Sequence, residues 1–100
     1  MYTKGFYKGQ TNEEIKEEIM AEGFVPVKIT NSSGYVYNAH SHSETKLLAF
    51  LQGGMEVRVE ESFFKCSEGD KLVIPGNKVH SAIVLSGGCV FYWAEKRVSV

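Results

Sequence analysis

Two stretches decide the fold of this chain: GYVYNAHSH at residues 34–42 and GDKLVIPGNKVH at residues 69–80. They contain His40, His42 and His80, and the 100 residues hold no other histidine. On a β-strand, His40 and His42 place both imidazoles on one face, because side chains alternate with a period of two. A third imidazole from a neighbouring strand completes a three-nitrogen site with open coordination positions, as in catalytic rather than structural metal centres.

The composition is that of an ordinary globular chain, and its length fits one domain over residues 1–100. A formal net charge of −1 gives no reason to expect nucleic acid or an anionic membrane as a partner. Residues 1–10 lack the apolar run of a signal peptide, and no stretch approaches the roughly 18 apolar residues of a membrane span. We therefore expect a soluble, cytoplasmic protein. Cys66 and Cys89 lack CxxC spacing and are expected to be free thiols.

A short helix is predicted ahead of the strands. The sequence Thr-Asn-Glu-Glu at residues 11–14 is a capping-box pattern, so the helix is expected over 12–22, with Gly23 as its left-handed stop. Its thin apolar stripe predicts a helix that lies against a sheet, and its acidic face is expected to be solvated; the stripe consists of Ile15, Ile19 and Met20. Residues 1–23 are thus an N-terminal extension and helix, and residues 24–97 form the main body.

From residue 24 onward the pattern is that of an all-β protein. The clearest alternation is MEVRVE at residues 55–60, with apolar and charged residues in turn. Eight short strands separated by glycine-rich turns favour a sandwich or barrel. The expected strands are 24–30, 35–42, 46–52, 55–60, 62–66, 71–74, 79–85 and 89–97, and the glycine pairs at 53–54 and 87–88 are interpreted as turns between them.

The two opening stretches resemble the sequence motifs of the cupin superfamily. Residues 34–53 are similar to the first motif, G-x5-H-x-H-x3,4-E-x6-G, and residues 69–84 to the second, G-x5-P-x-G-x2-H-x3-N. The resemblance implies a double-stranded β-helix, that is, a small jelly-roll barrel with a short N-terminal α-helix. It also implies that His40, His42 and His80 are ligands of one divalent metal inside the barrel.

Three positions depart from this pattern. Lys46 stands where the first motif has its glutamate, Asn77 replaces the second glycine of the second motif, and Val84 replaces its asparagine. An ammonium group cannot ligate a metal, and Glu44 is the one nearby acidic residue that could take over this role. Without the carboxylate, imidazoles still suit Zn, Ni, Cu or Fe(II), whereas Mn and Mg prefer oxygen ligands.

Lys46 is expected to share a strand face with Leu48 and Phe50. A buried lysine needs a charged or hydrogen-bonding partner. One hypothesis is that Lys46 binds the anionic group of a ligand on the metal; the alternative is that it extends to solvent. Inward-facing aromatic residues, of which Phe50 and Trp93 are candidates, would line the ligand pocket.

Three functions remain open at this point. The first is a metal-dependent enzyme acting on a small anionic or oxygenated molecule, without a choice among dioxygenase, isomerase and lyase chemistry. The second is a non-catalytic module that senses a small molecule or metal. The third is a structural barrel whose histidines only form hydrogen bonds and whose interior is filled. A homodimer is expected, because a barrel this small has exposed sheet edges and residues 2–10 belong to no predicted element.

Overall fold

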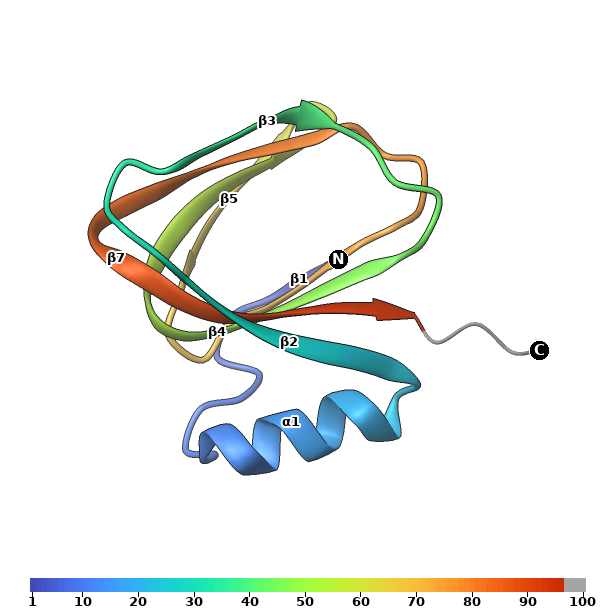
Figure 1. Ribbon diagram of the computed structural model, residues 1–100, viewed down its shortest axis with the longest axis vertical. Coiled ribbons are helices and arrows are strands. Elements are labelled where there is room, and N and C mark those ends of the chain that lie inside the picture. The colour runs from blue at the N-terminus through green and yellow to red at the C-terminus, as the bar shows by residue number, and fades with distance from the viewer. Residues whose placement is uncertain (97–100) are drawn as a thin grey trace.

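Two long strands, β4 (Lys46–Val59) and β7 (His80–Lys96), run through the whole structure and pair with each other from Lys46–Glu95 to Val59–His80 (Figure 1). The computed structural model describes residues 1–96. The remaining elements are β1 (Tyr2–Thr3), α1 (Asn12–Ala21), β2 (Phe24–Asn31), β3 (Val36–His40), β5 (Ser62–Ser67) and β6 (Lys71–Ile74).

Bends in β4 and β7 fold the sheet into two facing layers. The first half of β4 and the second half of β7 lie in one layer with β1, β2 and β6, and their other halves lie in the second layer with β3 and β5. All neighbouring strands are antiparallel. This is the jelly-roll barrel that the sequence predicts.

The predicted turns at residues 53–54 and 87–88 are wrong, because both glycine pairs lie inside continuous strands. The predicted strands 46–52 and 55–60 are one strand, and so are 79–85 and 89–97, of which residue 97 lies outside the described residues. Gly53 and Gly88 have φ angles of +76° and +79°. A Cβ atom on Gly53 would lie 2.0 Å from the carbonyl oxygen of Gly88. The glycines therefore permit a bend and a close approach of two backbones.

Two cores hold the layers together. The first lies between the two layers and contains Leu48, Phe50, Met55, Val57, Val59, Cys66, Leu72, Ile74, Val84, Cys89 and Phe91. The second lies between α1 and the outer face of the first layer and includes Ile15, Ile19, Leu47, Ala49, Tyr92 and Ala94. Both cysteines are buried free thiols, as predicted.

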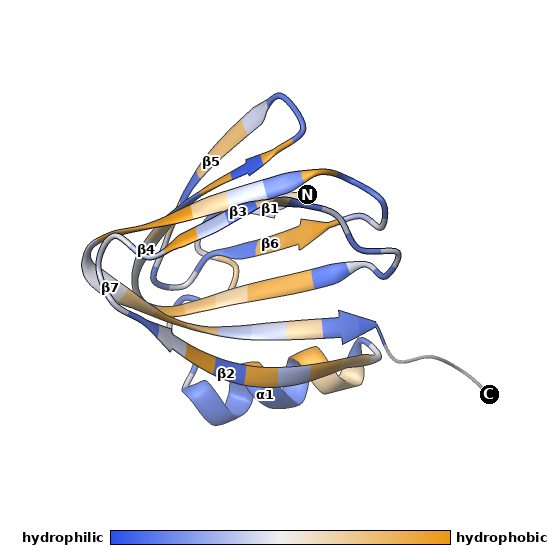
Figure 2. Ribbon diagram, turned by 45° about the horizontal axis from the view of Figure 1, so that its top comes forward, coloured by the Kyte–Doolittle hydropathy of each residue, from blue (hydrophilic) through white to orange (hydrophobic). Residues whose placement is uncertain are grey.

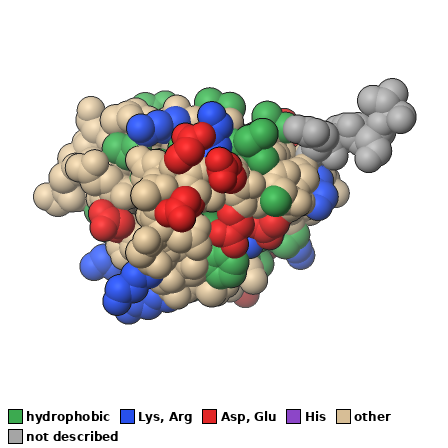
Figure 3. Space-filling model, turned by 90° about the horizontal axis from the view of Figure 1, so that it is seen from below, with side chains coloured by type: hydrophobic (Ala, Val, Ile, Leu, Met, Phe, Trp, Pro, Cys, Tyr) green, Lys and Arg blue, Asp and Glu red, His purple; other side chains and the backbone are tan. Residues whose placement is uncertain are grey.

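The helix forms as predicted, except that it ends one residue earlier and leaves Met20 exposed. Thr11 and Glu14 make both hydrogen bonds of the capping box, at 2.8 and 3.1 Å, and Gly23 has a φ of +89°. The acidic side chains of α1 lie at the surface seen in Figure 3. Among residues 1–96 no helix has the length and apolar character needed to cross a membrane.

The N-terminal extension is part of the barrel, which the sequence does not predict. Tyr2 and Thr3 pair with Leu72 and Lys71 at the edge of β6. The buried carboxylate of Asp70 fixes this segment, because it accepts hydrogen bonds from the Tyr2 hydroxyl and the Gly5 N–H, both at 2.8 Å. Side-chain bonds of this kind replace the longer ladder that two residues cannot supply.

A pair of alanine substitutions tests the role of the glycine bend. Gly53→Ala is expected to destabilise the protein by more than about 3 kcal/mol or to prevent folding, because its Cβ would collide with backbone atoms. Gly87 also has a positive φ, of +95°, but nothing lies within 4 Å of its Cβ position. Gly87→Ala should therefore cost only about 1–2 kcal/mol. Urea unfolding measures both, and equal losses would contradict the close-approach explanation.

Candidate metal centre

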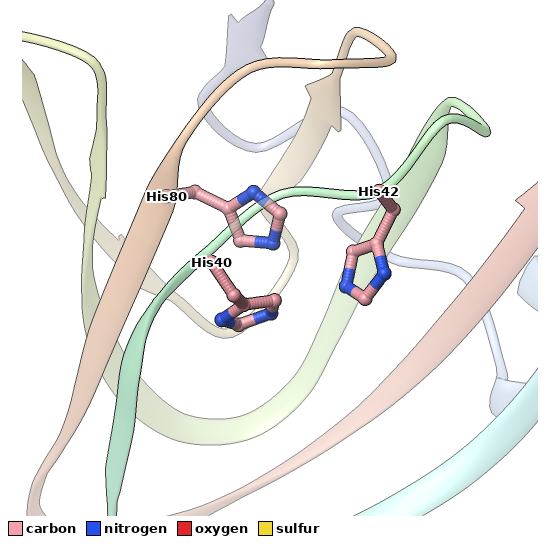
Figure 4. A group of neighbouring side chains, drawn as sticks. All are labelled: His40, His42 and His80. Atoms are coloured by element: carbon pink, nitrogen blue, oxygen red, sulfur yellow. The ribbon is translucent and has the colours of Figure 1, made fainter.

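The three histidines converge at one end of the barrel (Figure 4). His40 is the last residue of β3 and is the cross-strand neighbour of His80, the first residue of β7. His42 reaches them from the loop between β3 and β4. One ligand nitrogen from each ring lies within 4.8 Å of the other two. A single ion placed among the rings could contact all three.

His42 reaches the cluster by a route that differs from the prediction. The predicted strand 35–42 ends at His40, so strand alternation does not orient His42. Instead, the His42 carbonyl accepts a hydrogen bond of 2.6 Å from the Asn77 N–H. Gly76 lies so close that a Cβ atom there would be 2.3 Å from the carbonyl oxygen of Ser43. Asn77 has a φ of +66°, in the left-handed region that asparagine adopts more readily than most other residues.

Hydrogen bonds to the backbone fix two of the imidazole rings. The Nδ1 atom of His80 lies 3.0 Å from the carbonyl oxygen of Lys78, and Nδ1 of His40 bonds in the same way to the carbonyl of Asn38. A carbonyl only accepts, so Nδ1 carries the proton and Nε2 keeps its lone pair. The Nε2 atoms of His42 and His80 are buried and have no hydrogen-bond partner within residues 1–96. In metal-binding histidines, the ring nitrogen that does not bind the metal commonly donates its hydrogen to a carbonyl in the same way.

The surroundings of His42 and His80 favour the neutral form of their imidazoles. Burial lowers the pKa of His42, and the ammonium of Lys46 lowers it further, while Glu44 has a smaller opposing effect. Burial is also the main cause of the lowered pKa of His80; its bond to Lys78 opposes the shift, and His40 and Lys46 add to it. A neutral imidazole is the form that ligates a metal.

Lys46 points into the barrel. Its side chain is only 2% exposed and forms an ion pair with Glu95, whose side chain is 53% exposed. Its Nζ lies 5.4 Å from the centre of the Trp93 ring, a cation–π arrangement. The alternative in which Lys46 extends to solvent is therefore wrong. Sequence reasoning missed Glu95, although it shares a strand face with the inward residues Phe91 and Trp93.

The other candidate residues differ in their relation to the histidines. Glu44 accepts a hydrogen bond of 2.5 Å from the Ser43 hydroxyl and is not part of the cluster of potential ligands. Trp93 lies at the site, with its ring centre 5.8 Å from that of His42. Phe50 is fully buried in the core against Phe91 and is not among the residues that line the cavity next to the histidines.

That cavity is small, with a volume of about 20 Å³. Its walls are His40, His80 and eight further residues, most of them apolar: Tyr37, Leu48, Met55, Val57, Ile74, Ala82, Phe91 and Trp93. A space of this size holds about one water molecule. Side chains thus fill the barrel interior, and a ligand larger than water must approach the histidines from the mouth.

Comparison with solved structures identifies the fold. KdgF from a Halomonas species is 25% identical with a TM-score of 0.66, over 77% of this chain and 72% of that protein. An RmlC-like cupin from Shewanella frigidimarina is 22% identical with a TM-score of 0.65, over 73% and 66%. Bacillus subtilis oxalate decarboxylase, described with Mn(II) centres, is 21% identical with a TM-score of 0.70, over 86% of this chain but 24% of that protein.

No family model and no curated protein matches the sequence. The structural likeness nevertheless confirms what the two motifs predict: the chain has the cupin fold. The fold and the histidine cluster together fit a metal-binding cupin.

The influence of Lys46 on the histidines can be measured in metal-free protein. His42 and His80 are expected to titrate below 6.5, so unfolded chains bind more protons just below that pH, and the free energy of unfolding falls as the pH drops through 6.5. Lys46→Met should raise both pKa values, because one repulsive charge is lost. NMR titration of the imidazole protons measures this. Lys65→Met, at an exposed position on β5, is the control. Unchanged pKa values in Lys46→Met would contradict the effect of the Lys46 charge on the two histidines.

Proposed function

We propose that His40, His42 and His80 hold one divalent transition metal at the mouth of the barrel, and that its open positions bind a small anionic molecule. The observation that carries this proposal is the orientation of the rings. Two Nδ1 atoms bond to backbone carbonyls, and two buried Nε2 atoms have no partner within residues 1–96. Unpaired buried polar atoms are costly, and a metal ion removes that cost.

The donor set favours zinc, nickel, iron or copper over manganese. All three donors are imidazoles, and Lys46 occupies the position where the cupin motif has a carboxylate. Manganese prefers oxygen ligands, so the Mn(II) centres of oxalate decarboxylase are not expected here. A bound transition metal supplies Lewis acidity toward an oxygen atom of the ligand or of water.

The charge at the site favours an anionic ligand. The ammonium of Lys46 contributes to the lowered pKa values of both His42 and His80, which indicates that its field reaches the metal position. Its counter-ion, Glu95, is half exposed and therefore replaceable. An anion bound to the metal would meet a second positive charge at Lys46.

An enzyme and a sensing module both fit this site, and Glu95 favours the enzyme. Glu95 brings a half-exposed carboxylate to the edge of the site, where a proton-transfer group is needed. The filled interior is what a purely structural barrel would have. The unpartnered imidazole nitrogens argue against that alternative, because such a barrel would satisfy them with hydrogen bonds.

Metal binding is tested by titrating metal-free protein with zinc and with cobalt(II). One equivalent should bind to the wild type. His40→Ala should weaken binding by more than about 100-fold, because losing a ligand costs more than losing a group that only hydrogen-bonds to a ligand. Glu44→Gln is the matched control and should retain wild-type affinity, since Glu44 lies outside the ligand cluster. A wild-type protein that binds neither metal would refute the proposed function.

We also propose a homodimer, formed through the outer face of the layer that contains β3 and β5. Val36, Phe63 and Ile83 on this face are 54%, 63% and 43% exposed. Oppositely charged Glu56 and Arg58 lie beside them on β4, so across a two-fold axis each charge can meet its opposite. The outer face of the other layer is covered by α1 instead. A second copy therefore fits this face better than a strongly charged partner.

Light scattering at tens of micromolar measures the oligomeric state. The wild type is expected at twice the chain mass. Ile83→Glu should give the monomer mass, because it places a charge in the apolar part of the interface. Val25→Glu, at a similarly exposed position on β2, should leave the dimer intact. A monomeric wild type would contradict this proposal.

A further inference from the structure

The inner face of β2 carries two exposed valines beside the histidine cluster. Val25 is the cross-strand neighbour of Glu95, and Val27 is the neighbour of Trp93. Glu95 and Trp93 in turn pair with Lys46 and Leu48 on β4. Because directly opposed residues point to the same side of a sheet, all of these side chains share one face.

These valines lack the burial that their position predicts. Val25 and Val27 are 48% and 56% exposed and belong to neither hydrophobic core. Phe24, on the other face of β2, is buried in the core under α1. Hydrophobic and hydrophilic residues alternate along β2, as in a strand with one apolar face (Figure 2). On its inner side that apolar face has no protein partner over Val25 and Val27 among residues 1–96.

Trp93 connects the valines to the metal centre. Its ring centre is 5.8 Å from that of His42 and 5.4 Å from the ammonium of Lys46. Val25, Val27 and Trp93 therefore form a continuous apolar surface, here named the β2 shelf, that begins at the Lys46–Glu95 pair. Neighbouring strands are about 4.8 Å apart, so the shelf extends roughly 10 Å from Lys46 to Val25.

We propose that the β2 shelf binds the hydrocarbon part of a small amphiphilic carboxylate, whose carboxylate group lies against Lys46 and the metal. The head-group half of this inference rests on the proposed function. The Lys46–Glu95 pair indicates that the head group is a carboxylate, because Lys46 already pairs with a carboxylate at that position. A ligand carboxylate makes the same charge-assisted bond while the half-exposed Glu95 turns to solvent.

The hydrocarbon half follows from the exposed apolar area. A second copy of the chain could also cover the valines, but the shelf lies directly beside the most polar group in the barrel mouth, the Lys46–Glu95 pair. A ligand with an anionic head and an apolar tail matches both parts at once. Removal of this apolar surface from water supplies affinity that grows with tail length.

The test is a titration of metal-loaded protein with acetate, butyrate and hexanoate. Complete burial of a methylene would raise the affinity about fourfold. The shelf is open on one side and should supply about half of that free energy, so the affinity should rise about twofold per added methylene. Methyl NMR should show shifts at Val25 and Val27 on hexanoate addition. Val27→Ser should flatten the dependence on tail length without abolishing acetate binding. The matched control is Met20→Ser, at 47% exposure on α1 and away from both the shelf and the proposed dimer face, and it should behave as wild type.

The outcomes separate this inference from the proposed function. Equal affinity for acetate and hexanoate, or equal shifts at Met20 and Val27, would overturn the shelf while leaving the metal centre intact. If the wild type binds no metal but hexanoate still shifts the Val25 and Val27 methyl signals, the shelf stands and the metal centre fails. Conversion of a wild-type dimer to monomers by Val27→Ser would assign the shelf to a second copy and overturn the inference.

Discussion

The pairing of β4 with β7 along nearly their entire length is the interaction on which both the barrel and the site depend. At one end of this ladder His80 pairs with Val59, and at the other Lys46 pairs with Glu95. In a flat sheet these ends would lie far apart. The bend at Gly53 and Gly88 folds the ladder over, so that its two ends meet at the barrel mouth. As a result, the charge of Lys46 contributes to the lowered pKa of His80.

The Lys46–Glu95 pair gives the mouth its character. Removing an ammonium from water costs several kcal/mol unless a partner compensates for it. Here the two members of the pair differ in burial, because Lys46 is buried and Glu95 is half exposed. Loss of Glu95 would leave a buried, unpaired charge, whereas loss of Lys46 would leave a carboxylate that solvent can reach. The structure thus retains a fixed positive charge beside the histidines, and its counter-ion can move.

Much of the fold is predictable because the strongest signals are local. The capping box at Thr11 forms as its four-residue pattern predicts. The three histidines of the two short motifs come together in the structure. The glycine pairs mislead because a turn and a bend both need the same backbone freedom at Gly53. The two-residue strand at Tyr2 is too short to show an alternation in the sequence. Its position depends on a hydrogen bond to Asp70, which is distant in the sequence.

The site shows the same division between local and tertiary information. Strand parity places Lys46 on the face of Leu48 and Phe50 but leaves open whether its ammonium stays inside or extends to solvent. The partner that decides this, Glu95, lies 49 residues away and meets Lys46 only through the register of β4 and β7. Parity also fails for His42, which lies beyond the end of β3 and is held by a backbone bond from Asn77. A residue in a loop has no alternation to exploit, so tertiary contacts decide its direction.

The filled interior constrains where any chemistry can take place. Aromatic and aliphatic side chains leave about 20 Å³ beside the histidines, so the barrel functions as a packed support and not as a container. A rigid support holds the three imidazoles from β3, β7 and one loop in a fixed arrangement, which lowers the cost of organising ligands around an ion. The open side of the mouth, bounded by Lys46, Trp93 and β2, is then the region where the chain can distinguish one small molecule from another. Specificity in this protein should therefore depend on the first residues of β2 and the last residues of β7 more than on the interior of the barrel.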